Sequence, residues 1–169
     1  MAKKINIPIA DAEIDALSVG DSVLLSGVMI TGRDSVHKWM SDTFIKKTRQ
    51  PAGDDLEVFE AIRPILQGGV IYHCGPVVGG LDTRQYRFVA AGPTTSIREE
   101  PYQGDVMRLF NLKGVIGKGG MAAKTLAACQ EVKGVYFHAI GGGAPVIATS
   151  VKRVLGGHKV EFGGPGGMG

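Results

Sequence analysis

The sequence predicts a single α/β domain, and three observations support this prediction. The chain has 169 residues, the size of one ordinary domain. Hydrophobic residues make up 44% and charged residues 21%, as in a globular protein with an apolar core. Short apolar runs alternate with amphipathic segments, and many of the 26 glycines lie between them. We therefore expect one domain over residues 1–169, with a glycine-rich tail at 163–169.

Charge and cysteine content argue against several functional classes. The formal net charge is +3 and charges of both signs are mostly interleaved, which is too mild an excess to predict nucleic-acid binding. No apolar run approaches the roughly 18 residues of a membrane span, so we expect a cytoplasmic protein with no membrane or nucleic-acid partner. Cys74 and Cys129 lack metal-binding spacing and are predicted to be reduced structural thiols.

The N-terminal part is predicted to form strands around one short helix. Isoleucines alternate with other residues over 5–9, which predicts a strand, and its proline places that strand at an edge. Residues 11–17 are predicted to form a polar turn or short helix. The apolar runs 23–25 and 27–31 predict two strands on either side of a bend.

Two helices are predicted to follow. Apolar residues between 36 and 45 share one helical stripe, and Asp34 is a plausible N-cap for that helix. A polar break at 50–55 separates it from a second helix at 56–66, which we expect Pro64 to end.

Two strands and a hydroxyl-rich turn come next. The apolar run 70–74 predicts a buried strand that stops at Gly75, and 86–91 predicts another short strand. The turn at 92–96 carries two threonines and a serine that can cap the following helix, and Arg98 lies in the first turn of that helix.

The C-terminal part repeats the same alternation. Residues 115–116 predict a short strand, and the alanine-rich segment 121–132 predicts a helix. The run 135–140 predicts a strand, and 144–155 has the pattern of a helix.

Four glycine-rich junctions from strand to helix predict a site for a small polyanion. They lie at 32–33, 92–96, 117–120 and 141–143. In open α/β sheets such junctions gather at the carboxyl ends of parallel strands, where ligands bind. Three of them carry a cation: Arg33, Arg98 and Lys118. Each junction would add free N–H groups and the positive end of a helix dipole, so the junctions together would favour an anion.

Each junction also has a purely structural interpretation. Arg33 can be a surface cation beside an N-cap, and His37 is as compatible with packing as with function. The turn at 92–96 can be a capped turn, and 141–143 can serve close packing of strand and helix. Lys118 lies between glycines, where a solvated lysine contributes little to stability, and this favours function. It lacks the following Ser or Thr of a phosphate-binding Walker loop.

Five motifs, in this order, resemble those of the β subunit of class I iron–sulfur hydro-lyases. That family comprises fumarate hydratases and L(+)-tartrate dehydratases. The motifs are GRDSVHK at 32–38, IYHCGPV at 71–77, AGPTTSIR at 91–98, IGK at 116–118 and YFHAIGG at 136–142.

The resemblance implies a swivelling β/β/α domain whose glycine-rich junctions form the anion site. In two-subunit members this domain pairs with a separate α subunit, which holds a [4Fe–4S] cluster by three cysteines and leaves one iron open to substrate. The chain would be inactive alone and would form homo-oligomers of β or of αβ pairs. The implied reaction is the reversible hydration of fumarate to (S)-malate, with L(+)-tartrate dehydration as the alternative. A phosphate- or nucleotide-binding module without chemistry is the rival from another class.

The resemblance also assigns roles to residues. Arg33, Arg98 and Lys118 would clamp the substrate carboxylate, where proton loss from the adjacent carbon gathers two negative charges. Thr94 would stand beside that carbon, as a base with a depressed pKa or as a proton relay. The implied substrate-binding set also contains Asp34, His37, Gly92, Pro93 and Thr95.

Three features depart from the family pattern. Glu99 and Glu100 follow Arg98, where the family usually has methionine, and the segment 48–66 is longer than in many bacterial members. Family members commonly continue beyond the glycine-rich stretch, whereas this sequence stops at Gly169, so that segment is either absent or missing from a shortened sequence.

Overall fold

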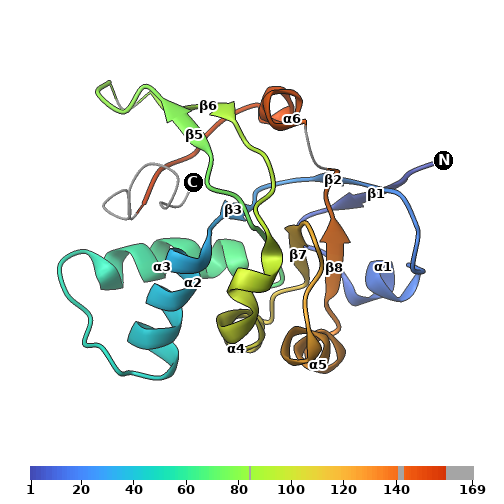
Figure 1. The fold of residues 1–169 in the computed structure, drawn as a ribbon, viewed down its shortest axis with the longest axis horizontal. Coiled ribbons are helices and arrows are strands. Elements are labelled where there is room, and N and C mark those ends of the chain that lie inside the picture. Colours follow the sequence, from blue (N-terminus) through green and yellow to red (C-terminus); the bar gives the residue numbers. More distant parts are fainter. Residues whose placement is uncertain (84, 141–142, 159–169) are drawn as a thin grey trace.

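The chain folds as a mixed α/β protein with parallel and antiparallel sheets, which confirms the predicted class (Figure 1). The computed structural model describes residues 1–83, 85–140 and 143–158. Four parallel strands form the central sheet in the order β3-β4-β7-β8; β1 and β2 form a parallel pair, and β5 and β6 an antiparallel one. The strands are β1 (Lys3–Asn6), β2 (Val23–Ser26), β3 (Ile30–Thr31), β4 (Val70–Tyr72), β5 (Val77–Gly79), β6 (Arg87–Ala90), β7 (Gly114–Gly117) and β8 (Val135–His138).

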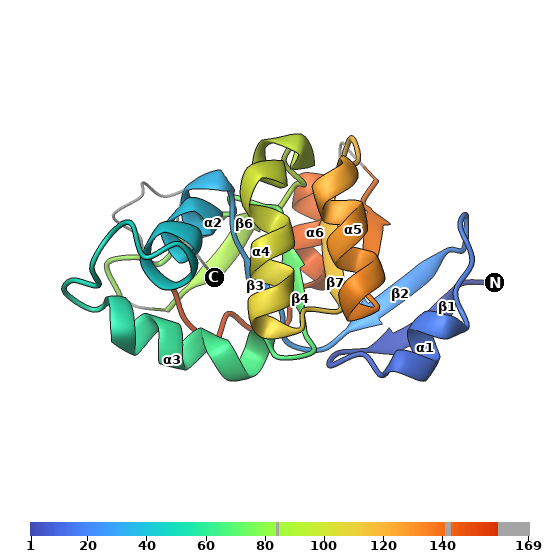
Figure 2. The ribbon, with the colours of Figure 1, turned by 90° about the horizontal axis from the view of Figure 1, so that it is seen from below.

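Helices cover one face of the central sheet (Figure 2). The helices of the described residues are α1 (Asp11–Asp15), α2 (Asp34–Met40) with the π-helix η1 (Ser41–Ile45), α3 (Asp55–Leu66), the 3-10 helix η2 (Ser96–Glu99) with α4 (Glu100–Phe110), α5 (Ala123–Val132) and α6 (Ala144–Ser150). Of these, α2, α3, α4 and α5 cover that face. Side chains of α2, α3, α4 and α5 form the main core with Ile71 and Val115 of the sheet, both fully buried. Because side chains alternate along a strand, the neighbouring Val70 faces the other side.

Two smaller units lie against that other side of the sheet. The β1–β2 pair and α1 pack there through Ile5, Ile9 and Ile14, which contact Val70 and Phe137. The β5–β6 hairpin and α6 pack near the ends of β4 and β7, with Tyr72 donating from Oη to the Ala91 carbonyl oxygen at 2.7 Å. In Figure 1, α4 and α5 lie below the sheet and α6 lies above it, so the sheet is a middle layer.

The predicted helix 56–66 is confirmed as α3, although Pro64 lies inside its last turn and the helix ends two residues later, at Leu66. Two other predictions are wrong, and the error in the strand has a physical reason. The predicted strand 27–31 is reduced to β3, because Gly27 has a positive φ of 136° and a Cβ there would lie 2.7 Å from the Ile7 carbonyl oxygen. Arg33, and not Asp34, occupies the N-cap of α2.

The second junction leaves a strand that is not parallel to the others. The prediction required all junctions to follow parallel strands, but β6 belongs to the antiparallel hairpin. Its partner β5 was not predicted, because three residues before a glycine give little periodicity. Of the fourth junction, residues 141–142 lie outside the described part of the chain, as does the tail 163–169. Among the helices that the structure describes, none combines the length and apolarity that crossing a bilayer requires.

Candidate active site

The carboxyl ends of three neighbouring strands carry the first and third cationic junctions. The backbone pairing of the sheet continues beyond the strands: the Gly32 amide donates to the Tyr72 carbonyl oxygen at 2.9 Å, and the His73 amide donates to that of Ile116 at 2.8 Å. Arg33, two residues after β3, and Lys118, directly after β7, therefore lie at one edge of the sheet, with the end of β4 between them.

The segment 94–96 returns to this edge although it leaves a different sheet. The Thr94 amide donates to the His73 carbonyl oxygen at 2.7 Å, and the Ser96 amide donates to the Lys118 carbonyl oxygen at 3.0 Å. Thr95 also pairs with Lys118 as an isolated parallel bridge. The backbones of three of the four junctions thus meet at one edge. The second junction reaches this edge through main-chain hydrogen bonds, because the strand before it, β6, is not part of the parallel sheet.

The side chains at this edge differ in exposure. Arg33 and Thr94 are half-buried, whereas Arg98 and Lys118 are exposed. Asp34 accompanies Arg33, with Oδ1 3.9 Å from Nε. Such a mixture leaves the cations accessible to a ligand that approaches this edge, while the backbone beneath them is fixed.

The turn that carries Thr94 is shaped by close packing. Pro93 is buried and Thr95 is exposed. A Cβ at Gly92 would lie 2.9 Å from that of Ala144, and the Ala91 amide donates to the Ala144 carbonyl oxygen at 3.1 Å. Gly92 therefore allows the start of α6 to approach the turn.

His37 lies behind the first junction. Its ring is fully buried, and Nδ1–H donates to the Arg33 carbonyl oxygen across 2.8 Å. Burial lowers the pKa of His37, so the imidazole is neutral at pH 7. The structure places this ring beneath the turn that presents Arg33. The predicted contact between the His37 imidazole and a substrate stays a prediction.

A buried polar cluster, which the sequence analysis did not single out, lies under the same edge. The side-chain amide of Gln103 lies 2.9 Å from His37 Nε2 and 2.5 Å from His73 Nε2. His73 Nδ1 lies 2.9 Å from Ser96 Oγ, which is 2.9 Å from Tyr136 Oη. The two histidines belonged to the quoted motifs, but nothing in their spacing indicated that Gln103 joins them.

Glu99 is a second residue that the sequence analysis left outside the site. Its side chain is fully buried, and neither carboxylate oxygen has a hydrogen-bond partner among the described residues. Burial raises the pKa of Glu99 to about 7 and Asp34 adds to this effect, while its own backbone amide, Arg33 and Arg98 lower the pKa in part. The sequence signal that could have placed Glu99 near the site is its position directly after Arg98, with which it shares one 3-10 turn.

The residues present do not fit an iron–sulfur cluster. Such clusters are held by several cysteine thiolates. The chain has two cysteines; Cys74 packs with Tyr72 and Ala91, whereas Cys129 packs against the main core. Burial raises the pKa of Cys74 to about 12, so this thiol is protonated. Within residues 1–83, 85–140 and 143–158, no group of three or more His, Cys, Asp or Glu side chains could hold a metal ion.

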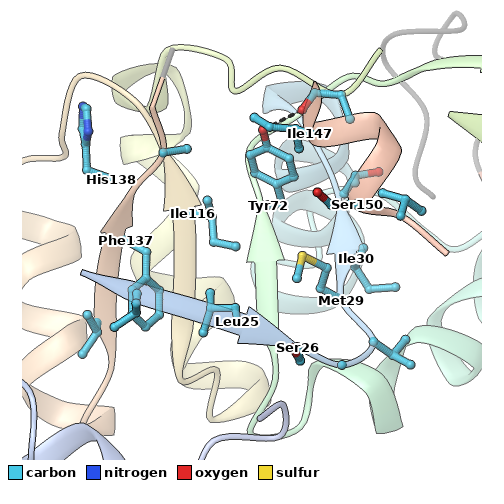
Figure 3. Close-up of a pocket in the computed structure, with 18 of the residues that line it drawn as sticks. Leu25, Ser26, Met29, Ile30, Tyr72, Ile116, Phe137, His138, Ile147 and Ser150 are labelled. Atoms are coloured by element: carbon cyan, nitrogen blue, oxygen red, sulfur yellow. Dashed lines mark hydrogen bonds between the residues drawn. The ribbon is translucent and has the colours of Figure 1, made fainter. Parts of the chain in front are cut away.

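A large apolar groove lies elsewhere, between the sheet, β2 and α6 (Figure 3). Leu25, Met29, Ile116, Phe137 and Ile147 line it, and its volume of about 1680 Å³ exceeds the roughly 300–1,000 Å³ of a fitted small-molecule site. Arg33, Thr94, Arg98 and Lys118 are not among its lining residues. The groove and the cationic edge are therefore separate features.

Comparison with known proteins agrees with this chain's motifs. The family model described as "Fumarase C-terminus" matches residues 1–164. A protein of Geobacillus stearothermophilus named "Putative fumarate hydratase class I" is 45% identical over 161 residues, which cover 95% of this chain and 28% of that protein. The chain thus spans little more than a quarter of that relative.

Proteins named as separate β subunits are also similar to this chain. The "L(+)-tartrate dehydratase subunit beta" of Escherichia coli (strain K12) is 31% identical over 168 residues, covering 98% of this chain and 74% of the subunit. A "Putative L(+)-tartrate dehydratase subunit beta" of Methanocaldococcus jannaschii is 32% identical over 142 residues, covering 84% of this chain and 66% of the subunit. On the match over 164 residues and on these relatives, the chain belongs to the fumarase C-terminus family, the β-subunit family of class I hydro-lyases.

Proposed function

We propose that this chain is the carboxylate-binding part of an iron–sulfur hydro-lyase that reversibly hydrates fumarate to (S)-malate. The observation that carries the proposal is the meeting of Arg33, Thr94 and Lys118 at neighbouring strand ends of one sheet edge. Arg98 follows Thr94 by four residues, in the 3-10 turn that begins at Ser96. A dicarboxylate needs several fixed cations at one place, and this edge supplies three.

The proton side of the reaction belongs to this chain in our proposal. In the dehydration direction, the C–H bond next to a carboxylate breaks, and its electron pair passes into that carboxylate. Arg33, Arg98 and Lys118 stabilise this doubly charged group more than the substrate, which lowers the barrier. Thr94 takes or relays the proton at its hydroxyl oxygen. The electron pair then returns to form the C=C bond while hydroxide leaves the neighbouring carbon, so malate yields fumarate and water.

The hydroxyl side belongs to a partner in our proposal. Because the two cysteines do not fit a [4Fe–4S] cluster, we place the cluster on an α subunit that faces the cationic edge. Relatives named as β subunits support a heteromer. The layer of β1–β2, the central sheet and the layer of helices support a β/β/α domain, which we propose swivels against the partner.

L(+)-tartrate is the second candidate substrate. Relatives named as tartrate dehydratase β subunits match 98% of this chain, although the fumarate hydratase relative is more similar, at 45% against 31% identity. Both substrates are four-carbon dicarboxylates, and three cations at one edge suit either.

The test is to co-express the chain with a cluster-bearing partner and assay fumarate hydration. We expect Arg98→Ala and Lys118→Ala each to lower kcat/KM at least about 100-fold, since each removes a charge that acts on the transition state. Arg63→Ala and Lys4→Ala remove exposed cations on α3 and β1 and should leave kcat/KM unchanged. Full activity of both site variants, with the cluster absorbance intact, would contradict the proposal.

A further inference from the structure

The buried polar cluster under the cationic edge touches all three turns that present the cations. We call its members the polar network: His37, Gln103, His73, Ser96 and Tyr136. At one end His37 binds the carbonyl oxygen of Arg33. In the middle Ser96 lies two residues before Arg98. At the other end Tyr136 Oη accepts from the Gly120 amide at 3.3 Å, two residues beyond Lys118.

The first hydrogen bond fixes the proton of His37. A carbonyl oxygen only accepts, so Nδ1 of His37 carries the hydrogen that points at Arg33. The ring is fully buried and neutral, because burial outweighs the hydrogen bonds and the nearby Asp34 carboxylate, which favour the charged form. Its Nε2 is therefore an acceptor and requires a donor from Gln103.

The amide of Gln103 meets this requirement in one orientation. With its oxygen toward the rings, His37 would need protons on both nitrogens and would carry a charge in a fully buried position. With its nitrogen toward the rings, the two N–H groups donate to Nε2 of His37 and Nε2 of His73. His73 then carries its proton on Nδ1 and donates to Ser96 Oγ.

The two rings cannot both be charged. Their centroids are 5.2 Å apart in a T-shaped arrangement, and both are fully buried. Burial, together with the neighbouring His37, lowers the pKa of His73 to about 3. The network is therefore a rigid chain of neutral groups, in which every member has a fixed direction of donation up to Ser96.

Gly117 makes the approach of the network possible. A Cβ at this residue would lie 1.8 Å from Ser96 Oγ and 3.0 Å from His73 Nδ1. The end of β7 therefore leaves room for the His73–Ser96 hydrogen bond directly before Lys118.

We propose that the polar network is a positioning device for the three cations, with Gln103 as the donor that joins its two halves. It acts on the cations through the backbones of the three turns. This inference rests on the proposed function for its effect on catalysis, but the hydrogen bonds themselves are testable without activity.

The first arm of the test reads the protons directly. His138→Gln and His158→Gln together leave His37 and His73 as the only imidazoles, because the chain has four histidines. A long-range ¹H–¹⁵N spectrum should show both as neutral Nδ1–H tautomers, without titration between about pH 6 and pH 8, where an unperturbed imidazole titrates. An imidazolium, or an Nε2–H tautomer of either ring, would overturn the assignment.

The second arm tests positioning with variants that remove single hydroxyl groups. Tyr136→Phe should raise hydrogen exchange at the Gly120 amide about tenfold or more, because that amide loses its acceptor. In the co-expressed complex, Tyr136→Phe and Ser96→Ala should lower kcat about tenfold with a smaller change in KM. Thr125→Val, which removes a comparable hydroxyl bond between α5 and Glu100, is the matched control and should change neither quantity.

The outcomes separate the two proposals. If the wild-type complex does not hydrate fumarate, the proposed function fails, and the imidazole spectrum and Gly120 exchange still decide the network. If the complex is active, and Tyr136→Phe and Ser96→Ala match the control in kcat, the positioning role is wrong while the function stands.

Discussion

Glu99 carries an ionisable carboxyl group in a fully buried position, where the charged form is unfavourable. A fully buried carboxylate with no other side chain to hydrogen-bond it is destabilised, and this is why its pKa rises to about 7. Below an unfolded-state pKa of about 4.5, both states hold the proton. As pH rises toward about 7, the unfolded state loses the proton first, so folding stability falls across this window.

Glu99→Gln should therefore stabilise the protein above neutral pH. We expect a gain on the order of 1–3 kcal/mol at about pH 8 and a smaller or absent gain at about pH 4, because glutamine keeps the shape without the charge. Urea unfolding at several pH values measures this. A constant difference between variant and wild type at all pH values would show that Glu99 does not titrate as described.

The backbone of Thr94 is fixed by a hydrogen bond, whereas its hydroxyl group has the proposed role in proton transfer. The Thr94 amide is fixed to His73, so substitutions of the side chain should leave the turn in place. In the co-expressed enzyme, we expect Thr94→Val to lower kcat about 100-fold or more, while Thr94→Ser retains most activity because it keeps the hydroxyl group. Loss of activity in Thr94→Ser together with retention in Thr94→Val, which keeps the methyl group, would point to packing of that methyl group instead of proton transfer.

At the scale of elements, α5 depends on a cap supplied by another helix. Glu100, the first residue of α4, accepts hydrogen bonds from the amides of Ala122, Lys124 and Thr125 at 3.0, 2.9 and 3.3 Å, and from the Thr125 hydroxyl at 2.7 Å. Burial raises the pKa of Glu100, but these bonds outweigh it, and the net pKa lies below its usual value. Four donors at the start of α5 are thus satisfied from outside the helix.

Removing this cap should destabilise the fold. We expect Glu100→Ala to lower the free energy of unfolding by about 1–3 kcal/mol at neutral pH. Because the folded pKa is lowered, the contribution of Glu100 is present above the unfolded pKa of 4.5 and is lost as pH falls through the folded value. The difference between variant and wild type, measured by urea unfolding, should therefore shrink in acid. Glu60→Ala, on the exposed face of α3, is the control.

At the scale of the whole molecule, stability is distributed unevenly around the central sheet. All of β4 is buried, and β7 is nearly so, with strands on both sides of each. The β5–β6 hairpin is half-exposed and pairs only within itself among the described strands. Lys118 therefore follows one of the most protected strands, β7.

Hydrogen exchange should show this gradient. We expect amides of β4 and β7 to exchange only through global unfolding, and those of the β5–β6 hairpin to exchange at least about 100-fold faster through local opening. Mass spectrometry of peptides from the two regions measures both rates in one experiment. Equal protection would mean that the hairpin opens only together with the sheet.

The elements that the sequence predicts well are those with strong local signals. The alanine-rich segment 121–132 became α5, and the apolar run 135–140 became β8, because periodicity and propensity there agree with the final packing. The extent of β3 was not predicted, because the close approach of Gly27 to Ile7 is a tertiary contact that periodicity does not report. The short β5 was not predicted, because three residues give little periodicity.

The α/β class, the family and the residue types that suit a dicarboxylate could be predicted from patterns along the chain. Which segments meet could not, because it depends on contacts between distant parts of the folded chain. Thr94 leaves an antiparallel hairpin, yet one hydrogen bond to the His73 carbonyl oxygen returns it to the edge that carries Arg33 and Lys118. The same holds for Gln103 and the buried Glu99, because burial and hydrogen-bond partners are properties of the folded chain in three dimensions.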